Sequence, residues 1–192
     1  MSKHDKLRNF VADITRLIET APDEASILAE GRDLLAALVA EDDWLPEAYA
    51  QPHPQHYQQH LLWADPLDRL SIVSFVWGPG QQTPVHDHRV WGLVGILRGA
   101  EVSRTFSTDA AGKLVESAPE RLERGTVAAV SPTIGDIHRI ANAYEDRVSI
   151  SIHVYGGNIG KIRRAVFDAQ TGAAKEFVSG YSNDTLPNLW AA

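Results

Sequence analysis

The sequence contains no cysteine, and its basic residues are outnumbered by its acidic ones. The absence of cysteine excludes disulfides, thiolate-ligated zinc, iron–sulfur clusters and a cysteine nucleophile. With 18 Lys and Arg against 25 Asp and Glu, the net charge is −7. This balance argues against nucleic acid or an anionic membrane surface as a partner. It does not exclude a small anionic substrate, because a buried arginine or a metal acts locally.

Long hydrophobic runs are also missing. No stretch approaches the roughly 20 consecutive apolar residues that span a bilayer, and the first residues lead into a charged amphipathic segment instead of an apolar signal region. We therefore expect a cytoplasmic protein. The 192 residues suffice for one domain with a sizeable core, and a hydrophobic content of 44% is typical of soluble globular proteins.

The first part of the chain has the apolar spacing of helices. One predicted stripe consists of Leu7, Phe10, Val11, Ile14, Leu17 and Ile18. A second helix opens with Pro22, Asp23 and Glu24 in its first turn, and its stripe consists of Ile27, Leu28, Leu34, Leu35, Leu38 and Val39. A short third helix is expected from about Asp43. These stripes fit helices packed on the protein's own sheet, with partner docking as the alternative.

From about Tyr57 the pattern changes to short strands separated by turns rich in Gly, Pro, Asn and Asp. The expected strands are 59–63, 70–77, 101–106, 113–115, 121–123, 126–130, 137–140, 148–155, 163–167 and 176–178. Short strands with no helices between them indicate an antiparallel sandwich or barrel. The predicted class is mainly β (α+β).

We expect one domain over residues 1–192, with N-terminal helices over 1–50, a barrel over 56–178 and a C-terminal tail over 179–192. The tail is rich in turn residues and should wrap the barrel, anchored by Leu186, Leu189 and Trp190. No chemistry is predicted in it.

A His-x-His pair, His86 and His88, follows a loop rich in Gly and Pro. Alternate residues of a strand face the same side, so the two imidazoles would converge on one point and form a plausible metal site. Such a pair alone also fits two surface or core histidines. Asp87, between them, should point away from the metal.

Two histidine segments together resemble the two motifs of the cupin family. Gly80, His86, His88 and Gly99 have the spacing of the first motif, and Gly125, Pro132, Gly135, His138 and Asn142 that of the second, with one extra residue before and one within its Pro-x-Gly step. The resemblance implies a cupin β-barrel or jelly roll preceded by two or three helices. It also implies a metal held by His86, His88 and His138. Gly92 replaces the glutamate ligand of the cupin pattern, which leaves three neutral ligands and an open face on the metal.

The segment 148–155 alternates strictly, with Ser151, His153 and Tyr155 on one face. Three polar groups directed inward can form a relay, whereas the alternative is the wet face of an edge strand. With this strand the chain resembles the cupin-fold thiol dioxygenases of the cysteine dioxygenase type I family, and bacterial 3-mercaptopropionate dioxygenases in particular. That resemblance implies an Fe(2+) enzyme that adds both atoms of O2 to a thiol sulfur. Tyr155, backed by His153 and Ser151, would donate a hydrogen bond at the metal.

The substrate expectation depends on two departures from the animal-type cysteine dioxygenases. Their Tyr-x-Arg segment, whose Arg holds the substrate carboxylate, corresponds here to Tyr57-Gln58-Gln59. Their tyrosine crosslink needs a cysteine near the position of Gly92, so Tyr155 should be an unmodified phenol. Bacterial 3-mercaptopropionate dioxygenases use a later arginine, which Arg164 matches better than Arg163. We expect Arg164, helped by Gln59, to bind 3-mercaptopropionate, with cysteine as the second candidate.

Other interpretations stay open. A three-histidine zinc site could support hydrolysis or hydration, and a non-enzymatic cupin could bind a metal and sense a ligand. His53, His56 and His60 fit neither cupin motif and are expected in a loop or on the surface. Trp77 and Trp91 belong either to the pocket wall or to the barrel core. The sequence gives no oligomeric state.

Overall fold

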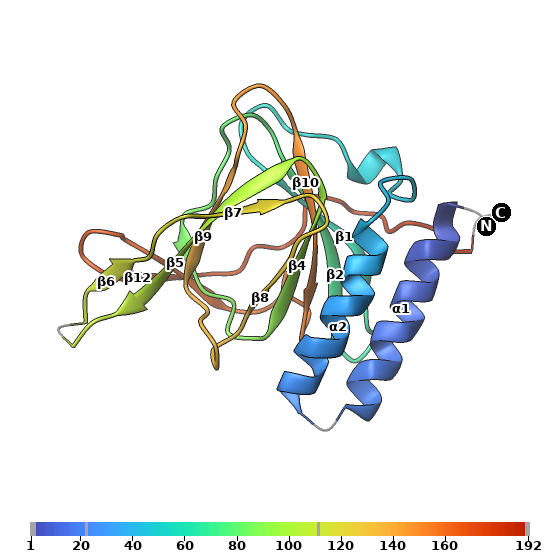
Figure 1. Ribbon diagram of the computed structural model, residues 1–192, viewed down its shortest axis with the longest axis horizontal. Helices are drawn as coiled ribbons and strands as arrows, with labels where there is room; N and C mark the ends of the chain where they lie inside the picture. Colours follow the sequence, from blue (N-terminus) through green and yellow to red (C-terminus); the bar gives the residue numbers. More distant parts are fainter. Residues whose placement is uncertain (1–2, 22, 111, 191–192) are drawn as a thin grey trace.

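The computed structural model describes residues 3–21, 23–110 and 112–190, in which two helices precede a β-barrel (Figure 1). The helices are α1 (Lys3–Thr20) and α2 (Glu24–Val39). Asp23 caps α2 by accepting a hydrogen bond from the backbone N–H of Ser26 at 2.8 Å. Pro22, predicted in the same turn, lies outside the described residues. Neither described helix has the length and hydropathy needed to cross a membrane.

The prediction of a third helix from about Asp43 is wrong. The chain near Asp43 forms bends, and only a single 3₁₀ turn, Glu47–Tyr49, follows. Pro46 has extended backbone angles and stands just before this turn. Because three residues give little helical hydrogen bonding, this segment is a connector between α2 and the barrel.

The barrel consists of two antiparallel sheets. The first has the spatial order β1 (Gln58–Ala64), β2 (Ser71–Trp77), β10 (Ser149–Tyr155), β4 (Gly92–Arg98) and β8 (Val127–Val130). The second has the order β12 (Ala174–Phe177), β11 (Arg164–Phe167), β3 (Val85–His86), β9 (His138–Asn142), β5 (Ala100–Thr108) and β6 (Leu114–Glu116), and β7 (Glu120–Glu123) pairs with β5. The predicted mainly β class and cupin barrel are confirmed.

The two faces of the five-stranded sheet have different partners. Ile150, Ile152 and Val154 of β10 face outward, in one apolar cluster with the helices. A side chain at Gly95 of β4 would come within 2.9 Å of Leu35 on α2, so glycine allows the helix to pack closely on the strand. The prediction that the helices pack on their own sheet is confirmed. The inner face of the same sheet borders a cavity that the second sheet closes.

The C-terminal tail runs beside β1. Ser182 and Asn183 exchange hydrogen bonds with Gln59 and Leu61, which covers a strand that would otherwise be a free edge. Leu189 is buried, as predicted. The predicted anchoring by Leu186 and Trp190 is wrong, since these side chains are 51% and 76% exposed. Polar contacts along β1 attach the tail in their place.

Candidate metal centre

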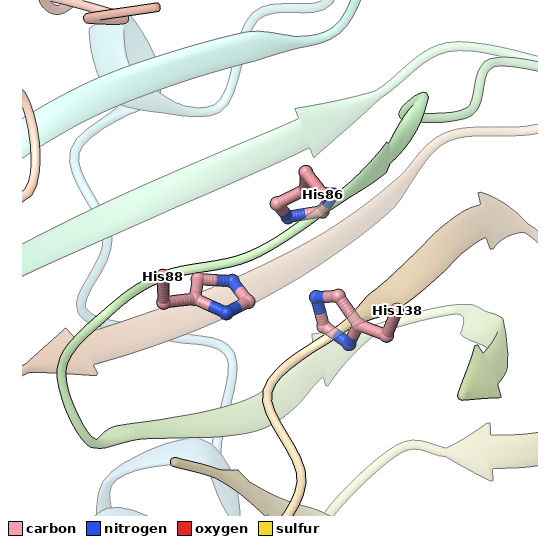
Figure 2. A group of neighbouring side chains, drawn as sticks. All are labelled: His86, His88 and His138. Carbon is pink, nitrogen blue, oxygen red and sulfur yellow. The ribbon is translucent and has the colours of Figure 1, made fainter. Parts of the chain in front are cut away.

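Three histidines from two segments of the chain point toward one another (Figure 2), and all three line the cavity. His86 ends β3, His88 follows it in a loop, and His138 begins β9 opposite His86. Each pair of ring centroids is 4.8 Å apart, and one nitrogen from each ring lies within 4.8 Å of the others. Among the described residues, this is the one group of three or more His, Asp or Glu found close enough together to hold a metal ion.

Burial keeps these imidazoles neutral. It lowers the pKa of His86 to about 4, and it holds the pKa values of His88 and His138 well below their usual range. The positive charge of Arg164 adds to the lowering for His86 and His88. A neutral imidazole has a lone pair for a metal, so the three rings are in the ligating form at neutral pH.

Hydrogen bonds to Nδ1 orient two of the rings. His86 Nδ1 lies 3.0 Å from the carbonyl oxygen of Pro84, and His88 Nδ1 lies 3.0 Å from Oδ1 of Asp136. Both partners are acceptors, so each Nδ1 carries the proton and Nε2 is the free ligand atom. Asp136 also accepts the backbone N–H groups of His88 and Arg89. Asp136 was not singled out in the sequence, where its position two residues before His138 is the only signal.

Asp87 does not join the cluster. Its Oδ1 accepts the backbone N–H of Ala165 at 2.7 Å, and its Oδ2 lies 3.3 Å from Nε of Arg89. The carboxylate between the two histidines therefore ties the loop to β11.

Replacing Asp136 by asparagine should weaken metal binding by about 10- to 100-fold, the usual effect of losing a carboxylate that orients a ligating histidine. The loss of charge should leave the fold intact, because an amide can still accept the backbone N–H of His88. Metal titration of the purified variant measures this effect. Asp146→Asn, at an exposed carboxylate, is the matched control; equal affinity in the two variants would remove Asp136 from the centre.

A hydrogen-bonded relay on β10 ends beside the histidines. Ser151 Oγ lies 2.8 Å from His153 Nε2, and His153 Nδ1 lies 2.7 Å from the Tyr155 hydroxyl. The strand is buried throughout and lies between β2 and β4, so the alternative of a wet edge strand is wrong. The Tyr155 ring stacks on His88 with centroids 5.5 Å apart.

Both aromatic members of the relay are neutral. Burial lowers the pKa of His153 to about 3. Burial also raises the pKa of Tyr155, although Arg164 partly opposes that effect. The phenol therefore keeps its proton and can donate a hydrogen bond into the cavity.

Gly92 makes room for the tyrosine. It pairs with Tyr155 across β4 and β10, and a Cβ at this position would lie 2.8 Å from Cδ1 of the Tyr155 ring. Gly92, which stands where the cupin pattern has a glutamate, has no side chain, and the Tyr155 ring occupies the adjoining space.

A buried arginine lies in the same cavity, whose volume is about 290 Å³. Arg164 is 3% exposed, and its Nη2 donates to Ser179 Oγ at 2.6 Å. Its Nε is buried without a partner among the described residues. Arg163 points outward and approaches Glu176 on the surface. Only Arg164 of this pair can meet a ligand in the cavity.

The tail contributes Ser179 to the cavity wall, a position for which the sequence predicted no role. Gln59 Nε2 donates to Ser179 Oγ at 3.1 Å and to the carbonyl oxygen of Gly180 at 2.9 Å. Both amide protons of Gln59 are thus used by the tail. Ser179 accepts from Gln59 and Arg164, which leaves its own proton as a donor. No motif in the tail signalled this role.

The tryptophans and the other histidines considered in the sequence lie in different environments. Trp77 lines the cavity and donates through Nε1 to Ser151 Oγ at 3.2 Å, whereas Trp91 packs with the helical core. His53 and His56 lie in a loop outside the cavity, as predicted, with their ring centroids 3.8 Å apart. The expectation for His60 is wrong: it lies on β1 and is buried, because its side chain faces Tyr49 under the helices.

Comparison with known structures gives distant similarity. An uncharacterized conserved protein with a double-stranded β-helix domain from Klebsiella pneumoniae subsp. pneumoniae aligns with 59% of this chain and 89% of its own, at 18% identity and a TM-score of 0.47. A cupin superfamily protein from Desulfitobacterium hafniense aligns over 65% and 88%, at 18% identity and a TM-score of 0.44.

Comparison with protein families gives a match over most of the chain. The sequence pattern of the family described as "Cysteine dioxygenase type I" matches residues 8–169, which include α2, the three histidines, the relay strand and Arg164. This chain therefore belongs to the cysteine dioxygenase type I family of cupin-fold oxidoreductases.

Proposed function

We propose that the protein is an iron(II) thiol dioxygenase that oxidises 3-mercaptopropionate with O2 to 3-sulfinopropionate. The observation that carries this proposal is Arg164, a buried cation that shares a cavity with three neutral imidazoles and forms no ion pair among the described residues. An unpaired buried charge is strongly unfavourable, so its retention favours an anionic ligand. Guanidinium offers a carboxylate a two-pronged set of donors.

The residues fit an iron site of the three-histidine kind. His86, His88 and His138 would hold the metal, and the absence of a carboxylate from this group leaves the charge of the ion uncompensated. Imidazole suits iron as well as zinc. Iron(II), when bound, would supply the activation of O2 and hold the substrate sulfur as a thiolate.

Arg164 would fix the other end of the substrate. Its unpartnered Nε and the proton of Ser179 are donors available to one carboxylate. Gln59 would act indirectly, since its amide protons hold the tail that carries Ser179. The phenol of Tyr155 would donate a hydrogen bond to the reacting group between these two ends. The cavity volume of about 290 Å³ suits a small ligand.

The charge of the cavity favours 3-mercaptopropionate over cysteine. Cysteine would bring an ammonium group, and the described residues that line the cavity include no Asp or Glu to pair with it. Arg164 would repel that ammonium, because both are cations in a site of low dielectric. Burial of a charged group without a partner costs at least about 1–3 kcal/mol.

A panel of thiols tests this choice. We expect kcat/KM for 3-mercaptopropionate to exceed that for cysteine by about fivefold or more, because 1 kcal/mol, the lower bound above, corresponds to a factor of about five. The sulfinate product should be quantified for both thiols under the same oxygen concentration. A clear preference for cysteine would overturn the substrate assignment and favour a cysteine dioxygenase that gives cysteine sulfinate.

A further inference from the structure

A buried carboxylic acid lies behind the relay. Glu101 on β5 has 0% exposed surface, and neither of its side-chain oxygens completes a hydrogen bond with a described residue. Its neighbour Ala100 exchanges hydrogen bonds with Ser149 of β10 at 3.1 Å and 2.9 Å, so Glu101 lies beside the strand that carries the relay. An acid buried in this way requires a specific reason, because burial of an unpartnered polar group is unfavourable.

The polar groups that act on Glu101 are members of the relay. Ser151 and Trp77 approach its carboxyl group and favour the charged form, but burial outweighs them and raises the pKa of Glu101 to about 7. Glu101 is therefore protonated below neutral pH and ionised above it. The acid changes charge within the range in which enzymes operate.

The hydrogen bonds that lead from Glu101 through Ser151 and His153 to Tyr155 can run in two directions. When Glu101 is protonated it can donate to Ser151, and Ser151 then donates to His153 Nε2. His153 Nδ1–H in turn donates to the Tyr155 oxygen, so the Tyr155 proton faces the cavity. When Glu101 is ionised it accepts from Ser151, His153 carries its proton on Nε2, and Tyr155 donates to His153 Nδ1. Trp77 donates to Ser151 Oγ in both cases. Ser151, His153 and Tyr155 keep their mutual hydrogen bonds in either direction.

We infer that Glu101 is a positioning residue that sets the direction of the hydrogen bonds through Ser151 and His153, and so decides whether the Tyr155 phenol donates or accepts in the cavity. The inference rests on the proposed role of Tyr155. Glu101 would thus control the direction of the hydrogen bonds from outside the three residues of the relay.

The charges around Glu101 can be followed strand by strand among the described residues. Its charge raises the pKa of Tyr155 on β10, which also feels Arg164, Tyr57 and Asp136. Across the sheet its partners are Leu122 of β7 and Asn142 of β9. The Asn142 amide is occupied by backbone carbonyls. The cations of these two strands, Arg121 and Arg139, pair with Glu123 and Glu116 on the surface.

The tautomer of His153 reports the direction of the relay without any catalysis. We would record imidazole ¹⁵N shifts of the full-length protein loaded with zinc, which is diamagnetic, while the pH is raised from about 6 to about 9, around the ionisation of an acid of this kind. The His153 signals are identified by their loss in His153→Gln. The expected result is a shift of the His153 proton from Nδ1 to Nε2 as Glu101 ionises. Infrared difference spectra of the wild type should lose the carboxylic acid band of Glu101 over the same pH range.

Two variants complete the test. Glu101→Gln should fix one tautomer at all pH values, and Ser151→Ala should uncouple His153 from a Glu101 that still titrates. The matched control Glu123→Gln, at an exposed acid of β7, should behave as wild type. In turnover with 3-mercaptopropionate, wild-type kcat/KM should fall about tenfold as pH rises through this range, which is less than the roughly 100- to 10,000-fold contribution of a general acid or base because Glu101 acts through other residues. Glu101→Gln should lose this dependence.

The outcomes separate this inference from the proposed function. A His153 tautomer that does not change with pH in the wild type would overturn the inference, even if sulfinate is formed. A tautomer shift without thiol oxidation would support the switch and contradict the proposed function. If Glu101→Gln does not fold, the wild-type and Ser151→Ala titrations still decide between these results.

Discussion

Replacement of Arg164 by methionine should lower kcat/KM for 3-mercaptopropionate by at least about 30-fold, mainly through KM. Truncating one member of a buried, hydrogen-bonded charge pair costs about 2–5 kcal/mol, and 2 kcal/mol corresponds to that factor. Methionine keeps an unbranched side chain over the Phe177 ring, which the guanidinium now covers at 4.8 Å. Steady-state kinetics with the purified variant measure the effect.

Arg163→Met is the matched control, because the neighbouring side chain is 69% exposed and its ion pair among the described residues is with Glu176. It should change kcat/KM less than about twofold, as expected for a surface ion pair. A thiol without a carboxylate, 2-mercaptoethanol, should lose little when Arg164 is replaced, since it makes no ion pair. An unchanged KM for 3-mercaptopropionate in Arg164→Met would remove this residue from the substrate site.

Replacement of His86 by alanine should abolish stoichiometric metal binding and reduce thiol oxidation by more than the roughly 100-fold that follows loss of an outer partner. His86 would supply one of three ligands, so only two imidazoles would remain to hold the metal. The variant should still fold, because the change leaves β9 and β11 paired with β3 through the backbone. Metal content after dialysis and thiol-dependent oxygen uptake are the two measurements.

His56→Ala provides the control for the loss of an imidazole, since His56 is exposed in a loop and its ring lies beside that of His53. It should retain the metal content and activity of the wild type. If His86→Ala bound metal as tightly as His56→Ala does, the three-histidine centre would be wrong.

Much of the fold could be predicted because its signals are local. The strict alternation of β10 separates Ile150 and Ile152, which face the helices, from Ser151 and His153, which face the cavity. Helical spacing likewise predicted that Leu35 and Val39 would be buried. The histidine spacing carried a longer-range signal, since His86 and His138 are paired across two strands that lie far apart in sequence.

What the sequence did not indicate depends on contacts between distant segments. Ser179 belongs to a turn-rich tail, and only the hydrogen bonds of that tail to β1 bring its hydroxyl to Arg164. Asp136 and Glu101 are acids without a motif. Asp136 matters because it is hydrogen-bonded to His88, and Glu101 because it is buried beside Ser151. His60 alternates with the cavity-facing Gln59, but its burial depends on packing by Tyr49.

Metal analysis combined with oxygen stoichiometry tests the central claim most directly. Protein purified without added metal should contain iron, and its thiol-dependent oxygen consumption should match the sulfinate formed from 3-mercaptopropionate one for one, because both oxygen atoms enter the product. Stoichiometric zinc with no thiol-dependent oxygen uptake would contradict the account and favour hydrolysis or hydration at a three-histidine zinc site. Metal binding without any turnover, even after iron is added, would contradict it in favour of a non-enzymatic cupin.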